Sequence, residues 1–99
     1  MTHVLEIVEF KLNTNATAEA FLQEVQKTTS FVTGLEGFVE RHTAKQDDDL
    51  WVDVVEWQSM DHAKAASEAF VQSTETQGMM ALINPSTVVM KHFSVRNTM

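Results

Sequence analysis

The chain has 99 residues, with 14 acidic and seven basic side chains and a formal net charge of −7 at pH 7. This length predicts a single domain spanning residues 1–99, and an apolar fraction of 43% argues against wholesale disorder. The acidic balance argues against nucleic-acid binding, and the lack of cysteine excludes disulfides and thiolate metal sites. Because no stretch has the length of a membrane span, we expect no membrane association and a cytoplasmic location.

The N-terminal part of the chain predicts a strand followed by a capped helix. Residues 3–12 (HVLEIVEFKL) are rich in the aliphatic and β-branched side chains that are typical of strands. The turn that follows contains Asn15 and Thr17, either of which can cap a helix. This helix is expected over residues 18–33, because apolar side chains recur there at helical spacing and form one face.

Two strands are expected next. Gly34 ends the helix, and the GLEG turn leads into a strand over residues 38–45 (FVERHTAK). The polar segment QDDD then connects to a third strand over residues 50–57 (LWVDVVEW). Both faces of this third strand are apolar, and Asp53 is the residue that interrupts one of them.

The C-terminal part predicts a second helix, a short helical segment and a last strand. Ser59 can cap the helix, whose apolar stripe includes alanines that allow close approach to a sheet. Residues 73–83 are expected to form a short helical piece interrupted at Gly78. The NPS turn ends it, and residues 87–95 (TVVMKHFSV) form the last strand.

The order of these elements predicts the fold class. A β-α-β-β-α-β order is that of the α+β, ferredoxin-like split βαββαβ fold. Right-handed crossovers would place both helices on one face of a four-stranded antiparallel sheet, with the first and third strands in the centre.

The other face of this sheet is expected to be apolar as well. The large apolar side chains that we assign to it are Leu5, Ile7, Trp51, Val55, Trp57, Val88 and Met90. Leaving them in water would forgo about 1.5–3 kcal/mol per large side chain, and monomers rarely expose so large a patch. Packing of two sheets against each other is the simplest cover, so the sequence predicts a homodimer. The alternative is a cover from within the chain, by residues 72–83.

Several short motifs resemble the dimeric α+β barrel superfamily. They are the GLEGF turn, the strand that ends in VVEWQS, the alanine-rich helix after it and the closing VVMKHF strand. The sequence is most similar to the antibiotic-biosynthesis-monooxygenase-like branch, over nearly the whole chain. The resemblance implies that two sheets form a shared dimeric barrel, and that each subunit has a pocket between its sheet and its helices. Some members oxidise aromatic polyketides or quinols without metal or flavin, so no cofactor is expected; others degrade haem.

The sequence departs from this family at two positions that often carry its acid and base. The branch often has a Glu shortly before the aromatic residue that ends the third strand, and a His on the following helix. Val55 and Ser67 stand at these positions. The residues that the haem-degrading branch uses are also absent, so the resemblance disfavours haem degradation.

Asp53 is the first candidate catalytic residue, because it is a carboxylate on an otherwise apolar strand face. Burial in apolar surroundings raises the pKa of a carboxyl group unless a partner stabilises its charge. Such a group can act as a general base or orient a substrate hydroxyl. The alternative is a structural ion pair at the dimer seam, with Arg41 or Lys91.

His42 and His92 are the other candidate catalytic residues. Both lie in predicted strands and could face a cavity, where imidazole is the usual proton carrier at neutral pH. His92 is the stronger candidate because it shares a strand face with Met90 and Val88, and a structural role is the alternative for each histidine. No two histidines have the spacing of metal ligands, so no metal site is expected.

An apolar small molecule is the expected ligand, because methionine side chains adapt to irregular ligands and aromatic side chains can stack on a ring. The candidate substrate-binding residues are Trp51, Trp57, Glu9, Phe70, Met79, Met80 and Met90. Glu9 is included because it would join Asp53 on the partner-facing side of the sheet. For Phe70 and the methionines, ordinary core packing is the alternative.

Two functions are compatible with these residues. The first is a cofactor-independent monooxygenase-like enzyme that acts on an apolar aromatic or acyl molecule, with Asp53 or His92 moving a proton. The second is a non-catalytic dimer that binds an apolar, lipid-like molecule, which the departures at Val55 and Ser67 favour. If Asp53 and His92 lie in the same solvent-reachable cavity, the enzyme is favoured; if both are held in ion pairs at the dimer seam, the binding protein or a structural role is favoured.

Overall fold

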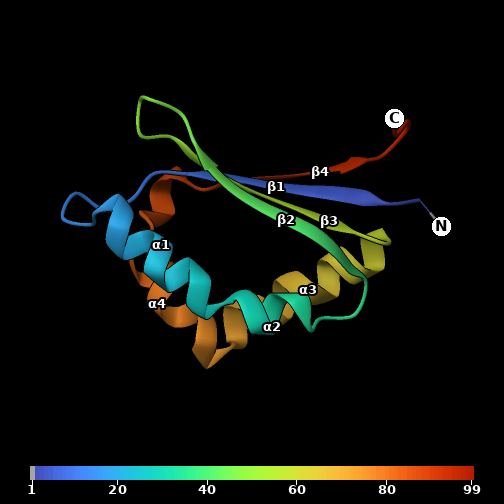
Figure 1. The fold of residues 1–99 in the computed structure, drawn as a ribbon, viewed down its shortest axis with the longest axis horizontal. Coiled ribbons are helices and arrows are strands. Elements are labelled where there is room, and N and C mark those ends of the chain that lie inside the picture. The colour runs from blue at the N-terminus through green and yellow to red at the C-terminus, as the bar shows by residue number, and fades with distance from the viewer. Residues whose placement is uncertain (1) are drawn as a thin grey trace.

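The computed structural model describes residues 2–99 and has the predicted ferredoxin-like α+β architecture (Figure 1). Its elements are β1 (Val4–Phe10), α1 (Ala18–Lys27), α2 (Thr29–Thr33), β2 (Phe38–Lys45), β3 (Trp51–Trp57), α3 (Met60–Gln72), the 3₁₀ turn η1 (Thr74–Thr76), α4 (Gln77–Ala81), the 3₁₀ turn η2 (Pro85–Thr87) and β4 (Val89–Ser94). The strands form an antiparallel sheet in the order β2-β3-β1-β4, so the prediction that the first and third strands are central is confirmed.

The helices begin where side-chain caps were predicted. Thr17 rather than Asn15 caps α1, and its hydroxyl oxygen accepts from the Ala20 amide at 3.1 Å. Ser59 caps α3, and its hydroxyl oxygen accepts from the His62 amide at 3.2 Å. Each cap provides an acceptor for one of the backbone donors that a helix N-terminus leaves free.

Two helical segments divide differently from the prediction. Thr28 ends α1 by donating its hydroxyl to the Val25 carbonyl, and α2 starts directly afterwards, so the helix expected over residues 18–33 is two helices. Gly78 lies inside α4 and does not interrupt it. A Cβ atom at Gly78 would collide with the side chain of Glu24, so this glycine allows α4 to approach α1 closely.

The structure corrects the predicted faces of the sheet. The register of β1 and β3 pairs Val4 with Trp57 and Phe10 with Trp51. Because paired residues point to the same face, both tryptophans and Asp53 lie on the face that the helices cover. We expected them on the uncovered face. The tryptophans are instead buried between the sheet and the helices.

The correction extends to three more residues of the set that was assigned to the uncovered face. Val55 lies on the helix side with the tryptophans, as does Met90, which pairs with Val8. Val88 lines a cavity on this side as well. The uncovered face is still apolar, but its large apolar side chains are Leu5, Ile7, Val52, Val54, Val89 and Phe93.

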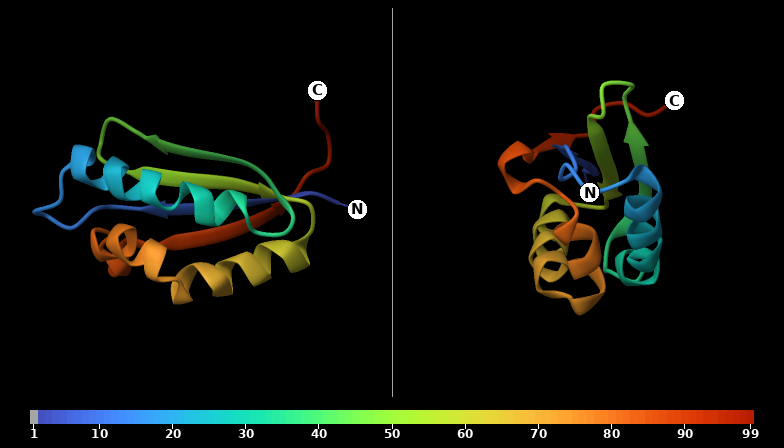
Figure 2. Two further views of the ribbon diagram at one scale, coloured as in Figure 1. Left: turned by 60° about the horizontal axis from the view of Figure 1, so that its bottom comes forward. Right: turned by 90° about the vertical axis from the view of Figure 1, so that its left-hand side faces the viewer.

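The core on the helix side consists of two clusters. The first contains Val4, Val32, Val55, Trp57, Ala63 and Ala66. The second contains Phe10, Phe21, Trp51 and Met79. Beneath the sheet, the segments α1–α2 and α3–α4 run side by side, as both views in Figure 2 show. Within residues 2–99, none of these helices combines the length and hydropathy that a membrane span needs.

Candidate functional site

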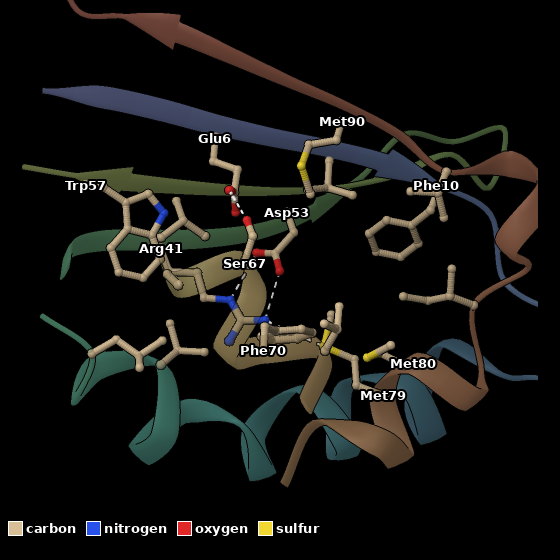
Figure 3. A pocket seen from close by; sticks show the side chains of 18 of the residues that line it. Glu6, Phe10, Arg41, Asp53, Trp57, Ser67, Phe70, Met79, Met80 and Met90 are labelled. Carbon is tan, nitrogen blue, oxygen red and sulfur yellow. Dashed lines mark hydrogen bonds and ion pairs between the residues drawn. The ribbon is translucent and has the colours of Figure 1, made fainter. Parts of the chain in front are cut away.

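A cavity of about 270 Å³ lies between the sheet and the helices (Figure 3). Its walls are mostly apolar, with Trp57 at one end, Phe10 at the other and Phe70 on the helical side. Four polar side chains line it: Glu6, Arg41, Asp53 and Ser67. The volume is near the lower end of the roughly 300–1,000 Å³ that is typical of ligand sites, so the cavity suits a small ligand.

The cavity opens to solvent beside β4. Val71, Val88 and Met90 all line the cavity, yet their exposed fractions are 55%, 41% and 48%. Large apolar side chains that are half exposed at the edge of an otherwise buried cavity mark its mouth. The mouth therefore lies between the C-terminal end of α3 and the start of β4.

Arg41 and Asp53 form an ion pair in the cavity wall, and each side chain is only 11% exposed. Nε and Nη2 of Arg41 donate to Oδ1 and Oδ2 of Asp53, at 3.0 and 2.8 Å, while Nη1 donates to the hydroxyl of Thr28 at 2.8 Å. Both oxygens of Asp53 are thus engaged by one guanidinium group in a bidentate pair. The predicted alternative for Asp53 named Arg41 as a partner, but the pair lies inside the subunit and not at a seam.

Glu6 forms a second polar group with Ser67 and His92. The Ser67 hydroxyl donates to Oε2 of Glu6 at 2.7 Å, and Nε2 of His92 lies 2.9 Å from the same oxygen. Within residues 2–99, Oε1 of Glu6 has no hydrogen-bond partner, and it is not among the fully buried unpartnered atoms. Since Glu6 lines the cavity, Oε1 is the oxygen available to a ligand.

Trp57 contributes a free donor to the cavity. Its side chain is among the most buried, yet its indole Nε1 has no partner within residues 2–99. Figure 3 shows this nitrogen on the side of the ring that faces the cavity. An unsatisfied buried donor costs about 1–3 kcal/mol, so a ligand with an oxygen acceptor would gain by binding here.

The structure brings five predicted substrate-binding residues together around the cavity: Trp57, Phe70, Met79, Met80 and Met90. Trp51 does not line it. Its ring packs on Phe21 at a centroid distance of 4.9 Å, in the core beyond the cavity.

Glu9 and His42 lie away from the cavity, on the uncovered face of the sheet. Glu9 pairs with Val52, so it points away from Asp53, and the prediction that these two carboxylates share a face is wrong. His42 is exposed there, with Nε2 3.5 Å from Glu40. Glu9 lies on the uncovered face as expected, and the error concerns Asp53, because our assignment of the faces of β3 was one residue out of phase with its register to β1.

Three polar residues of the cavity were not among the predicted site residues: Glu6, Arg41 and Ser67. The signal for Glu6 was present, because it alternates with Val4 and Val8 on one face of the first strand. No local signal indicates that Ser67 on α3 and His92 on β4 meet at Glu6, since they are far apart in the sequence. Within residues 2–99, no group of three or more His, Asp or Glu side chains is placed to hold a metal ion.

Comparison with known proteins supports the fold. The sequence matches no protein-family model. It matches no curated protein either. Among solved structures, the chain is similar to SnoaB, a cofactor-independent oxygenase from Streptomyces nogalater, with a TM-score of 0.76, 18% identity and coverage of 99% of this chain and 97% of SnoaB.

Two further structures are similar over comparable lengths. One is described as a candidate antibiotic biosynthesis monooxygenase from Chloroflexus aurantiacus J-10-fl; its TM-score is 0.69 at 13% identity, covering 98% of this chain and 96% of that chain. The other is a conserved protein from Bacteroides thetaiotaomicron VPI-5482, described as a possible oxidoreductase; its TM-score is 0.69 at 14% identity, covering 95% and 98%. These similarities confirm the expected ferredoxin-like α+β fold of the subunit.

Proposed function

We propose that this chain is a small cofactor-independent, monooxygenase-like enzyme that acts on an apolar aromatic molecule. The observation that carries the proposal is a solvent-connected apolar cavity that contains a few oriented polar groups. Such a cavity is the usual form of a small-molecule site. The shared fold with SnoaB, a cofactor-independent oxygenase, supports the reaction class.

The substrate that fits this cavity is small, aromatic and oxygen-bearing. A volume of about 270 Å³ limits the ligand to a few fused rings. Aromatic and methionine side chains form the walls, and these pack well on flat apolar rings. The free Nε1 of Trp57 would donate a hydrogen bond to a carbonyl or hydroxyl oxygen of the ligand.

Oxygen consumption and ligand binding test this proposal together. We expect the wild-type protein to consume oxygen with one or more members of a panel of anthrones and quinols, and the same compounds to change its tryptophan fluorescence on binding. Val71→Trp fills the mouth of the cavity and should weaken binding roughly tenfold or more.

Gln72→Trp is the matched control, because Gln72 is exposed on the same helix and does not line the cavity. It should bind as the wild type does. A panel that neither binds nor consumes oxygen would remove the proposal.

A second candidate function is the non-catalytic binding of an apolar molecule in the same cavity. The observation that favours it is the pairing of Asp53 with Arg41 and of His92 with Glu6. Val55 and Ser67 also stand at positions where the resemblance implies an acid and a base. Saturable binding without oxygen uptake, or a co-purified apolar ligand in native mass spectra, would favour this function.

A further inference from the structure

We propose that Glu6 is the general base of this site, and that Ser67 and His92 are positioning residues that hold its carboxylate. This inference rests on the proposed function in one respect, because it takes the substrate to be the aromatic molecule that occupies the cavity. It assigns the removal of a proton from the substrate to Glu6, which was not among the catalytic residues predicted from the sequence.

The two carboxylates of the cavity differ in what they offer to a ligand. Both oxygens of Asp53 accept from Arg41, so proton transfer to Asp53 would require a buried ion pair to break. Glu6 has no cationic partner with a permanent charge, and its Oε1 is free. A base must have a lone pair within reach of the proton that it abstracts. Glu6 meets this condition and Asp53 does not.

The contacts of Glu6 fix the direction in which Oε1 points. Ser67 comes from α3 and His92 from β4, so the carboxylate of β1 is held from two sides at Oε2. Two hydrogen bonds at Oε2 restrict rotation of the carboxylate, which belongs to a residue that lines the cavity (Figure 3), and they leave Oε1 unengaged within residues 2–99. They also offset part of the cost of removing a charged group from water.

His92 connects this carboxylate with solvent. Its side chain is 24% exposed, whereas that of Glu6 is 10% exposed. The imidazole is therefore the part of the group that water reaches. It gives Glu6 a solvated neighbour that does not itself line the cavity.

The proposed step is the removal of a proton from an acidic C–H group next to a carbonyl. The C–H bond breaks, the proton moves to Oε1 of Glu6, and the electron pair remains on the substrate as an enolate. The step needs no oxidant or reductant. It can therefore be observed without oxygen, as exchange of the substrate hydrogen with solvent deuterium.

Anaerobic hydrogen–deuterium exchange of anthrone in D₂O tests this step. The exchange rate is measured by NMR and compared with the rate in buffer alone. We expect the wild-type protein to accelerate exchange and Glu6→Gln to reduce the acceleration about 100-fold or more. Glu9→Gln is the matched control, because Glu9 lies on the same strand but on the opposite face. It should exchange anthrone at the wild-type rate.

The positioning role of Ser67 predicts a separate pattern. Ser67→Ala should lower the exchange rate roughly tenfold while leaving the affinity for anthrone unchanged. Ser67→Thr, which retains the hydroxyl, should restore most of the rate. His92→Gln should behave as Ser67→Ala does, whereas His42→Gln, on the uncovered face, should have no effect.

The outcomes separate this inference from the proposed function. Wild-type exchange in Glu6→Gln, or no exchange above buffer with the wild-type protein, would overturn the role of Glu6. If Glu6→Gln does not fold, Glu6→Asp withdraws the carboxylate by one methylene, and unchanged exchange in that variant overturns the role equally. Exchange without oxygen uptake would support Glu6 as the base and contradict the proposed oxygenase activity. Oxygen uptake that is unaffected in Glu6→Gln would support the oxygenase activity and contradict the role of Glu6.

Discussion

At the scale of single residues, the cavity contains two buried carboxylates that differ in their hydrogen-bond partners. Asp53 and Arg41 neutralise each other, and the Thr28 hydroxyl accepts from the remaining nitrogen of the guanidinium group. The pair therefore closes part of the wall without leaving a free charge in it. Glu6 retains one carboxylate oxygen without a hydrogen-bond partner in the described part of the chain, because Ser67 and His92 both contact its other oxygen.

Substitution of one member of the buried pair should destabilise the fold strongly. Arg41→Met and Asp53→Asn each leave one buried group without its charged partner, so each should lower the free energy of unfolding by about 3–5 kcal/mol. The double variant should lose clearly less than the sum of the two single losses. Urea denaturation of all four proteins as a double-mutant cycle measures this coupling, and strictly additive losses would contradict it.

At the scale of elements, the sequence predicted where helices and strands lie much better than which way their side chains point. The caps Thr17 and Ser59 and the bounds of β2 depend on local chemistry, which a short stretch of sequence contains. The faces of β3 depend on its register with β1, which is a long-range pairing. Because both faces of β3 are apolar, periodicity alone could not decide between them.

This limit explains the outcome for the candidate site. Phe70 and the methionines were assigned to a pocket between the sheet and α3, and they line the cavity. Glu9 was preferred to Glu6 only because its face was thought to be that of Asp53. The contacts that Ser67 and His92 make with Glu6 join three elements, and no local pattern carries that information.

The turn between α2 and β2 gives a prediction at this scale. Gly37 has a φ of 85°, and a Cβ atom there would collide with the side chain of His62. Gly37→Ala should therefore cost about 2–4 kcal/mol, from left-handed strain and overpacking. Gly34→Ala is the control, because Gly34 has a φ of −84° and ends α2 in a right-handed conformation. Thermal unfolding should show a much larger loss for Gly37→Ala, and equal losses would refute this reading of the turn.

At the scale of the whole molecule, the sheet has two different tasks. Its helix side encloses the cavity, and its other side is not covered by any helix within residues 2–99 (Figure 1). The edge strand β4 serves both sides, because Met90 points toward the cavity and Phe93 points away from it. Half of the Phe93 surface is exposed on the uncovered side. A surface that covers Phe93 would thus also hold the strand that forms the cavity mouth.

A second copy of this chain is the cover that we predict for that face. Of the six large apolar side chains found there, Leu5 and Ile7 were predicted and the other four were not. The original reasoning holds for all six, because each would gain up to about 1.5–3 kcal/mol on full burial. Static light scattering at micromolar concentration should give the mass of a dimer for the wild-type protein. Phe93→Glu should shift the mass toward that of the monomer, because two charges would face each other or be buried in the interface. Leu22→Glu is the control: Leu22 is 42% exposed, but it lies on α1, on the helix side of the sheet. A wild-type monomer at this concentration would show that the uncovered face stays in water, and the shared barrel would then be excluded for this chain.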